Sequence, residues 1–363
     1  MITKQKGHFF LLVLAALSAG LFTACASINN SGASLSDIRV QIEQSQDKWP
    51  IVYSSDYNIS FGGLEGLHPF DTKKYGRVFN QLEAKGLLKS DNYYTPLKPD
   101  EAVFLRHHSQ KYLDSLENSK AIARYTEVGL IKMLPNSVAY NAVVEPAKIA
   151  SSGSILAGEL ALKYGWAINL GGGYHHASKN RAGGFCAIAD VSLSILHLMD
   201  KNPKVKKVMI IDLDAHQGNG HERDFTGRDD IFILDVYNAA IYPRDEYAKA
   251  GIDLKVELEP FTKDAEYLSM LDRAMSEALK SFSPDIIYYV AGMDLLEGDR
   301  LGQLSITRGG IIQRDQMVFD YALKNNIPIT MLFGGGYQKS NAEIIADSID
   351  NLVSQFDLKS LRN

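Results

Sequence analysis

Five short apolar segments between residues 167 and 333 constrain the fold of this 363-residue chain more than any other feature. Each has the length of a β-strand, is rich in Ile, Val or aromatic residues and contains no charge. The segments are Ala167–Leu170, Val208–Ile211, Ile231–Leu234, Ile286–Val290 and Ile329–Phe333. They alternate with helical stretches such as Ile188–Met199, Tyr267–Ser281 and Arg314–Lys324. This alternation predicts a single α/β domain whose mostly parallel central sheet is flanked by helices.

Polar clusters directly follow four of these five segments. The clusters are Gly171–His176, Asp212–Gly220, Ala291–Asp294 and Gly334–Tyr337. In parallel α/β sheets, ligands bind outside the carboxyl ends of the strands. The clusters therefore predict one active site at that edge of the sheet.

The spacing of Asp214, His216 and Asp294 indicates a metal site. Residues two apart in an extended strand point the same way, so Asp214 and His216 could hold one cation, with Asp294 arriving from a neighbouring strand. Two carboxylates and one imidazole leave a position open for water and substrate, as a catalytic zinc requires. The alternative is a solvated acidic turn, and Asp212 could serve only as a support.

Several long stretches resemble the class IV histone deacetylases. They are Ile51–Asp71, Gly165–Asp190, Ile210–Phe225, Asp235–Pro243, Val290–Gly302 and Gly334–Ile349. The resemblance covers roughly residues 49–355 and implies the arginase/deacetylase fold. It also implies hydrolysis of N-acyl amides, with acylated lysine as the expected substrate and acylated polyamines or other N-acyl amines as alternatives. Acyl groups longer than acetyl are included, because the class is known to remove them.

The resemblance assigns roles to the polar residues. Asp214, His216 and Asp294 match the zinc ligands of the family, and Fe²⁺ remains an alternative metal. His175 and His176 match its tandem catalytic histidines, Asp212 the carboxylate that orients the first of them, and Tyr337 the tyrosine that hydrogen-bonds the substrate carbonyl. Gly184 and Phe185 match the lining of the acyl-lysine tunnel, with Tyr242 near its mouth. A structural K⁺ site is implied at Asp212, Asp214, His216 and Asp235.

One position departs from the class I pattern. The second histidine of class I pairs with Asp, where this chain has Asn219, a feature of classes II and IV. Because Asn cannot stabilise an imidazolium by charge, His176 should be the less basic histidine or the readier acid. We expect His176 to act as general base and then as general acid, with His175 as electrostatic support, although the two roles could be exchanged. Tyr337 and the zinc would stabilise the oxyanion.

Two other functions are compatible with the same architecture. Arginase-like hydrolases bind two manganese ions and need a further carboxylate two residues after the ligand histidine, where this chain has Gly218. A mononuclear zinc or Fe²⁺ site therefore fits better. A lipid-anchored protein that binds acyl ligands without turnover is the other alternative.

The first residues predict export and lipidation. Lys4 and Lys6 precede the apolar run Phe9–Leu21, and Ala24-Cys25 resembles the cleavage site of bacterial lipoproteins. We therefore expect a signal peptide at residues 1–24, a lipidated Cys25 with a flexible tether at 25–48, and a catalytic domain at 49–363. The chain would be anchored to the bacterial cell envelope. The residue after Cys25 is Ala26, which favours the outer membrane. The alternatives are an ordinary signal peptide and an uncleaved anchor.

The remaining residue types restrict partners and roles. The net charge is −5 without a long run of Lys or Arg, so no nucleic-acid partner is expected. Cys186 is the only cysteine besides Cys25 and is expected to be a buried apolar residue. Hydrogen-bonded or packing roles are expected for five further histidines, which are His68, His107, His108, His197 and His221. The sequence gives no indication of the oligomeric state.

Overall fold

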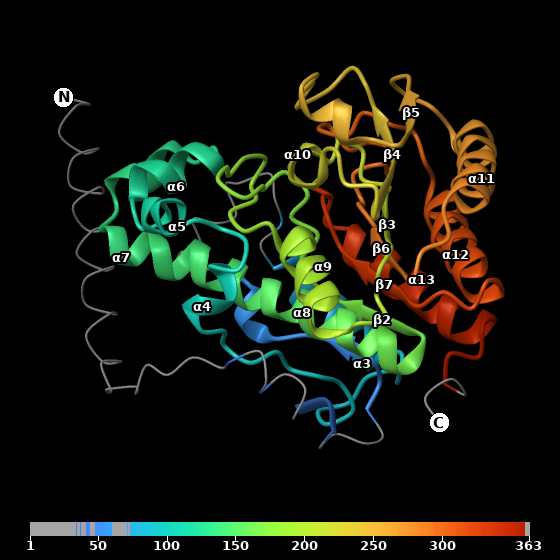
Figure 1. Cartoon of the computed structure of the whole chain (residues 1–363), viewed down its shortest axis with the longest axis horizontal. Helices are drawn as coiled ribbons and strands as arrows, with labels where there is room; N and C mark the ends of the chain where they lie inside the picture. Colours follow the sequence, from blue (N-terminus) through green and yellow to red (C-terminus); the bar gives the residue numbers. More distant parts are fainter. Residues whose placement is uncertain are drawn as a thin grey trace, which may run out of the picture.

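The computed structural model describes residues 34, 37, 41–43, 48–59, 71 and 73–359, and its centre is a parallel sheet (Figure 1). The sheet has seven strands in the order β1-β2-β7-β6-β3-β4-β5, and neighbouring strands pair in parallel. The strands are β1 Ile51–Val52, β2 Trp166–Asn169, β3 Val208–Asp212, β4 Ile231–Asn238, β5 Leu254–Leu258, β6 Ile286–Val290 and β7 Ile329–Leu332. This confirms the α/β fold that the apolar segments predict.

The five predicted strands are all present, and two further strands form the edges of the sheet. β5 escaped prediction because its residues alternate in exposure, with Lys255 and Glu257 exposed, as is usual for an edge strand. β1 has only two residues, which is too short for a pattern.

Alternate residues of the buried strands face two separate parts of the core. In β3, Met209 and Ile211 belong to one hydrophobic cluster, whereas Val208 and Ile210 belong to the other. All four are completely buried. This double burial explains why the strands are continuously apolar instead of alternating with polar residues.

Helices cover both faces of the sheet (Figure 1). α8 (Glu145–Tyr164) and α9 (Asp190–Lys201) pack on one face. The other face is covered by α3 (Lys74–Ala84), α11 (Asp264–Ser281), α12 (Arg308–Lys324) and α13 (Asn341–Gln355). α12 begins six residues before the predicted stretch, because the Thr307 side chain caps it by accepting a hydrogen bond from the Gly310 N–H.

Short helices between residues 101 and 144 form a separate layer beside α8 (Figure 1). They are α4 Glu101–Phe104, α5 Gln110–Leu116, α6 Ser119–Tyr125, the 3₁₀ turn η3 Gly129–Met133, α7 Asn136–Ala139 and the π turn η4 Tyr140–Val144. The other short elements are η1 Ser55–Tyr57, α10 Asn219–Phe225 and η5 Ala248–Gly251. Within the described residues, every helix is too short or too polar to cross a membrane.

Candidate functional site

The four strands that precede the polar clusters are neighbours in the sheet. Their spatial order is β2-β7-β6-β3, although their order along the chain is different. Because parallel strands end at the same edge, the residues that follow them converge there. The predicted meeting of the clusters at the carboxyl edge is thus a direct result of the strand order.

Asp214, His216 and Asp294 form the centre of this edge. His216 Nδ1 lies 3.1 Å from Asp214 Oδ1 and 2.9 Å from Asp294 Oδ2. Both carboxylates are fully buried, and His216 is 5% exposed. One donor atom of each residue lies within 4.8 Å of the others, so a single ion could contact all three.

The loop after β3, not an extended strand, brings Asp214 and His216 together. β3 ends at Asp212, and the His216 N–H donates to Asp214 Oδ1 at 3.0 Å. The Ala215 N–H donates to Asp294 Oδ1 at 2.9 Å, which ties this loop to the residues after β6. The predicted pair is therefore adjacent, but a loop held by backbone-to-carboxylate hydrogen bonds creates the geometry.

The charges of this group fit a cation. Burial and the charge of Asp214 together raise the pKa of Asp294 to about 7. Burial lowers the pKa of His216, but the two carboxylates outweigh it and raise that pKa to about 10. Two buried carboxylates thus retain a proton on the imidazole between them, in the position where a bound cation would supply the compensating charge. The donor set of two carboxylates and one imidazole suits zinc or Fe²⁺.

His175 and His176 lie beside this group, with ring centroids 4.0 Å apart. His175 Nδ1 is 2.9 Å from Asp212 Oδ2, whereas His176 Nδ1 is 2.8 Å from Asn219 Oδ1. The sequence predicted both pairings. Each histidine therefore has one ring nitrogen committed to a side chain behind it.

The partners give the two histidines opposite charge preferences. Burial lowers the pKa of His175, but the carboxylates of Asp212 and Asp214 outweigh it and raise the pKa to about 9. Burial and the neighbouring His175 and His216 hold the pKa of His176 well below its usual value. At neutral pH His176 is then the neutral ring that can accept a proton.

Tyr337 follows β7 on a loop that also contacts the group formed by Asp214, His216 and Asp294. The Gly335 N–H of this loop donates to Asp214 Oδ2 at 2.6 Å, and the Tyr337 N–H donates to Asp299 Oδ2 at 3.0 Å. The Tyr337 ring meets the His216 ring edge-on at a centroid distance of 6.3 Å. Burial and nearby carboxylates raise the pKa of the Tyr337 hydroxyl well above its usual value, so the hydroxyl remains a donor.

Aromatic side chains and a glycine lie next to these residues. The ring of Phe185 is 6.0 Å from the ring of Tyr337, and the ring of Tyr242 is 5.0 Å from that of His176. Tyr242 is 45% exposed. Gly184 packs so closely on His176 that a Cβ there would lie 2.1 Å from His176 Cδ2. Only glycine permits this approach.

A second buried group lies behind the histidine pair. Asp212, His221 and Asp235 offer donor atoms within 4.8 Å of one another. His221 Nε2 lies 3.5 Å from Asp212 Oδ2, and the carboxyl groups of Asp235 and Glu222 contact each other. Of the four residues predicted for K⁺, Asp212 and Asp235 have their side chains in this group, whereas the side chains of Asp214 and His216 lie with Asp294.

The remaining described histidines have the expected structural contacts. His107 Nε2 lies 2.7 Å from Asp224 Oδ2, and His197 Nε2 lies 2.9 Å from Glu159 Oε1. His108 Nδ1 donates to the Lys179 carbonyl at 2.8 Å. Cys186 is buried and free, as expected. Cys25 and His68, and the predictions made for residues 1–33, lie outside the described residues.

Two residues that support the site escaped the sequence analysis. Lys74 of α3 is buried and donates from Nζ to the carbonyls of Gly334 and Gly335 at 2.8 and 2.9 Å. Asp190 accepts from the Gly173 and Tyr174 N–H groups at 2.9 and 2.7 Å, and so holds the loop before the histidine pair. Lys74 lies 260 residues before its partner Gly334, and no local pattern indicates such a contact.

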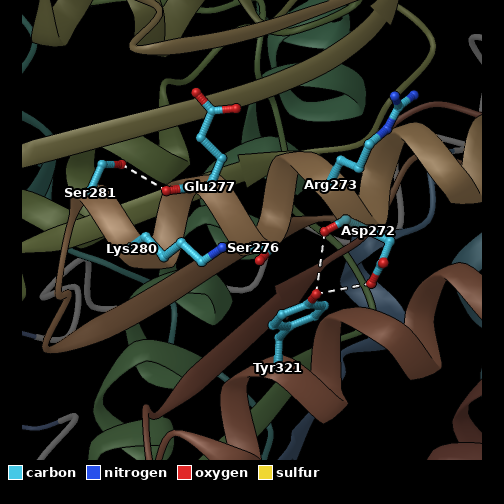
Figure 2. Close-up of a pocket in the computed structure, with 7 residues that line it drawn as sticks. All are labelled: Asp272, Arg273, Ser276, Glu277, Lys280, Ser281 and Tyr321. Carbon is cyan, nitrogen blue, oxygen red and sulfur yellow. Dashed lines mark hydrogen bonds between the residues drawn. The ribbon is translucent and has the colours of Figure 1, made fainter.

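A surface groove on α11 and α12 is separate from this site (Figure 2). Tyr321 of α12 donates to Asp272 Oδ1 of α11 at 2.9 Å, and the other lining side chains in Figure 2 come from one turn after another of α11. The groove shares no residue with the candidate site. Its lining is that of a solvated helix face, and we assign no function to it.

Comparisons with known proteins agree with the geometry. A profile of the histone deacetylase domain matches residues 68–354. Histone deacetylase 2 of Arabidopsis thaliana is 48% identical over 308 residues, which cover 85% of this chain and 79% of the plant protein. Histone deacetylase 1 of Homo sapiens is 28% identical over 293 residues, which cover 76% of this chain and 58% of the human protein. A crystal structure of acetylpolyamine aminohydrolase from Burkholderia pseudomallei superimposes with a TM-score of 0.64 at 18% identity, covering 84% of this chain and 98% of that one.

Proposed function

Because the chain belongs to the histone deacetylase family, we propose that it is a zinc-dependent amidohydrolase that removes acyl groups from acylated lysine. Family membership makes the chain a hydrolase of the deacetylase type, and the metal and the substrate are our further steps. The observation that carries them is the meeting of Asp214, His216 and Asp294 directly beside the neutral His176. The same donor set would accept Fe²⁺ in place of zinc.

The metal and the protein residues would divide the work. A bound zinc would polarise the acyl carbonyl and make the attacking water more acidic. His176 takes the proton of that water and later returns it to the nitrogen of the leaving amine. His175, held by Asp212, contributes positive charge beside the developing oxyanion, and the Tyr337 hydroxyl donates a hydrogen bond to it.

We also propose a structural potassium ion near the end of β3. The residues expected to surround it from the family resemblance are Asp212, Asp214, His216 and Asp235. Support comes from the complete burial of Asp212 and Asp235 close to each other. Burial and the neighbouring Asp212 and Glu222 raise the pKa of Asp235 well above its usual value, and a cation at this position would offset the crowding of carboxyl groups. The backbone and carboxylate oxygens of this loop are the hard donors that an alkali cation prefers.

The substrate proposal concerns lysine in proteins and peptides outside the cytosol. The 48% identical plant relative is named a histone deacetylase, which favours acyl-lysine over a free polyamine. The predicted export would remove this chain from chromatin, so we propose envelope proteins as the source of the acyl-lysine. The acyl group can be acetyl or longer.

We propose, from the sequence pattern alone, that the chain is exported and anchored by a lipid on Cys25. The segment 1–24 would be removed, residues 25–48 would form the tether, and 49–363 would be the catalytic domain. The envelope would then hold the enzyme at the membrane surface. The oligomeric state enters none of these proposals.

Hydrolysis of acyl-lysine peptides by the purified chain tests the function. We would load it with one equivalent of zinc and compare acetyl-, octanoyl- and myristoyl-lysine peptides with an acetylated polyamine. Asp294→Asn is the inactive blank, and Asp230→Asn, a partly buried carboxylate paired with Arg228 away from the site, is the matched control. We expect the wild type and Asp230→Asn to hydrolyse a peptide in a zinc-dependent reaction, and Asp294→Asn to show no hydrolysis.

Other outcomes would replace the proposal. Hydrolysis of the polyamine without any peptide would change the substrate class. Tight binding of acyl ligands without turnover would mean that the chain is a binding protein. Equal turnover by Asp294→Asn would remove the metal site from the mechanism.

A further inference from the structure

A chain of side chains extends from His176 to the loop after β4. His176 Nδ1 lies 2.8 Å from Asn219 Oδ1, and Asn219 Nδ2 donates to Asp245 Oδ2 at 3.1 Å. Asp245 lies between β4 and η5, far along the chain from the histidine pair. None of the motif assignments gives Asp245 a role.

The direction of these hydrogen bonds fixes one proton. An ionised carboxylate can only accept, so Asn219 must present its NH₂ group to Asp245 and its oxygen to His176. The oxygen of Asn219 can only accept in turn, so His176 Nδ1 must carry the hydrogen. In the neutral ring, Nε2 then has the free lone pair and is the nitrogen available for proton transfer.

The carboxylate at the end of this chain is held in place and ionised. Asp245 forms an ion pair with Arg223, and its Oδ1 accepts from the Ala248 N–H at 3.2 Å. Gln217 binds the Asp245 backbone twice, since the Asp245 N–H donates to Gln217 Oε1 at 3.0 Å and Gln217 Nε2 donates to the Asp245 carbonyl at 3.1 Å. Burial raises the pKa of Asp245, but these donors outweigh it and lower the pKa below its usual value.

We propose that Asp245 is a positioning residue that fixes the tautomer of His176 through Asn219. Asp245 does not touch the reacting atoms. It prevents the side-chain amide of Asn219 from rotating by half a turn. The rotated amide would place its NH₂ group against His176 Nδ1 and favour the tautomer with hydrogen on Nε2. This inference rests on the proposed function in one respect, which is the role of His176 as the general base.

The alternative role for Asp245 is purely structural. Its ion pair with Arg223 could join the loop after β4 to α10 without affecting the proton on His176. The two roles differ in one property, because a structural joint would respond to loss of either ion-pair partner. A tautomer lock requires the carboxylate on Asn219 and tolerates loss of Arg223.

Asp245→Asn is the central variant, since it keeps the shape of the side chain at position 245. It no longer forces Asn219 to donate its NH₂ group, because an amide can both donate and accept. We would record ¹⁵N-histidine NMR spectra of the zinc-loaded protein and identify the signals of His176 as those that are absent in His176→Gln. We would also measure kcat and KM on the best acyl-lysine peptide. We expect a single Nδ1–H tautomer in the wild type and a mixture in Asp245→Asn. kcat should fall by about tenfold to a hundredfold with KM and zinc content unchanged, because a wrong tautomer in a serine-protease triad costs about 10⁴-fold when the orienting residue touches the histidine directly.

Three further variants separate the two roles. Arg223→Gln should retain the tautomer and kcat. Asp230→Asn, which breaks a partly buried Asp–Arg pair just before β4, should do the same. The double variant Asn219→Asp with Asp245→Asn exchanges the two groups, restores an acceptor at His176 and should recover the Nδ1–H tautomer.

A single tautomer in Asp245→Asn would overturn the inference, whatever happens to kcat. Equal losses in Asp245→Asn and Arg223→Gln, with a lowered melting temperature, would show the structural role instead. If the wild type hydrolyses no acyl amide, the proposed function fails, but the NMR comparison still decides the role of Asp245. If the wild type is active and the tautomer does not change, this inference alone fails.

Discussion

At the scale of single residues, the partners behind the ring nitrogens distinguish the two active-site histidines. His175 has the carboxylate of Asp212 behind it, and His176 has the amide of Asn219. The pKa of His175 accordingly lies at about 9, and that of His176 well below its usual value. A proton acceptor must be neutral at the working pH, which favours His176 as the base.

Replacing Tyr337 by Phe should remove a hydrogen bond to the oxyanion and little else. The ring would keep its edge-on contacts with His216 and Phe185, so the loop and the metal ligands should stay in place. We expect kcat to fall by about two to three decades, as for the loss of one oxyanion donor. Steady-state kinetics and metal analysis measure both effects. Tyr321→Phe, which removes a hydroxyl from the surface groove of Figure 2, is the control. Loss of zinc together with activity in Tyr337→Phe would mean that the residue is structural.

His108 makes the stability of the protein depend on pH. Its Nδ1 donates to the Lys179 carbonyl, and its Nε2 accepts from the Ala189 N–H at 3.2 Å, so only the neutral ring satisfies both contacts. Burial lowers the pKa of His108 to about 4, against roughly 6.5 in an unfolded chain. Between these values the unfolded chain binds more protons. The stabilisation by neutral His108 is thus complete above pH 6.5 and disappears as the pH falls towards 4.

His108→Gln should remove this pH dependence. Relative to the variant, the wild type should lose about 2 kcal/mol of unfolding free energy between pH 7.5 and 5. Urea unfolding of both proteins at the two pH values gives the difference, in which contributions common to the two proteins cancel. If the unfolding free energy changed equally with pH in the wild type and in His108→Gln, His108 would not be the source of the pH dependence.

At the scale of elements, the sequence predicted the inner strands but not their order. Continuous apolar segments identified β2, β3, β4, β6 and β7, because strands buried on both faces have no polar positions. The order β2-β7-β6-β3 depends on pairings between segments far apart in the chain, which no local pattern records. Local motifs therefore predicted which residues follow the strands, and only the fold shows that those four strand ends are adjacent.

The supporting residues were not predictable for the same reason. Lys74 and Asp245 contact the site through atoms of distant loops, and each looks like an ordinary surface residue in the sequence. The proximity of Asp214 and His216 was predicted correctly, but its geometry was not, because β3 ends at Asp212 and a loop carries both residues. A spacing of two is compatible with an extended strand and with a loop, and the sequence does not distinguish them.

The loop between β7 and α13 should depend on Gly335 for metal binding. A Cβ at this position would lie 2.3 Å from Asp294 Oδ2 and 2.8 Å from Asp214 Oδ2. Such contacts are too short for any real side chain, so Gly335→Ala must displace both ligand carboxylates. We expect a loss of zinc affinity of at least tenfold, since displaced ligands and their supports cost about 10–100-fold in metal sites.

Gly309→Ala is the matched control for that experiment. A Cβ there would meet only Thr307 Oγ1 at 3.6 Å, which is an ordinary contact in the first turn of α12. Competition with a chelator compares the zinc affinities of the two variants and the wild type. An unchanged affinity in Gly335→Ala would show that the loop can move away from the ligands, and that its hydrogen bond to Asp214 is dispensable.

At the scale of the whole molecule, one edge of one sheet carries all the proposed catalytic and metal-binding residues. The rest of the domain supplies buried support from both faces, from α3 on one side to α9 on the other. The matched family profile, residues 68–354, contains every proposed site residue except Cys25. Catalysis and the proposed anchor therefore lie in separate segments of the chain and should be separable by experiment.

Cys25→Ser should abolish lipidation and leave hydrolysis intact. Acylation requires the thiol, and a serine hydroxyl does not replace it in the proposed processing reaction. Cells grown with labelled fatty acid should label the wild type and Cys186→Ser, whose substituted cysteine is buried in the domain, but not Cys25→Ser. Without acyl chains the variant should leave the membrane fraction, because stable anchoring needs at least two lipid signals or one with a basic patch. If Cys25→Ser still incorporates the label, the lipoprotein proposal is wrong. If it loses the label but stays in the membrane fraction, an uncleaved apolar segment at Phe9–Leu21 would be the anchor.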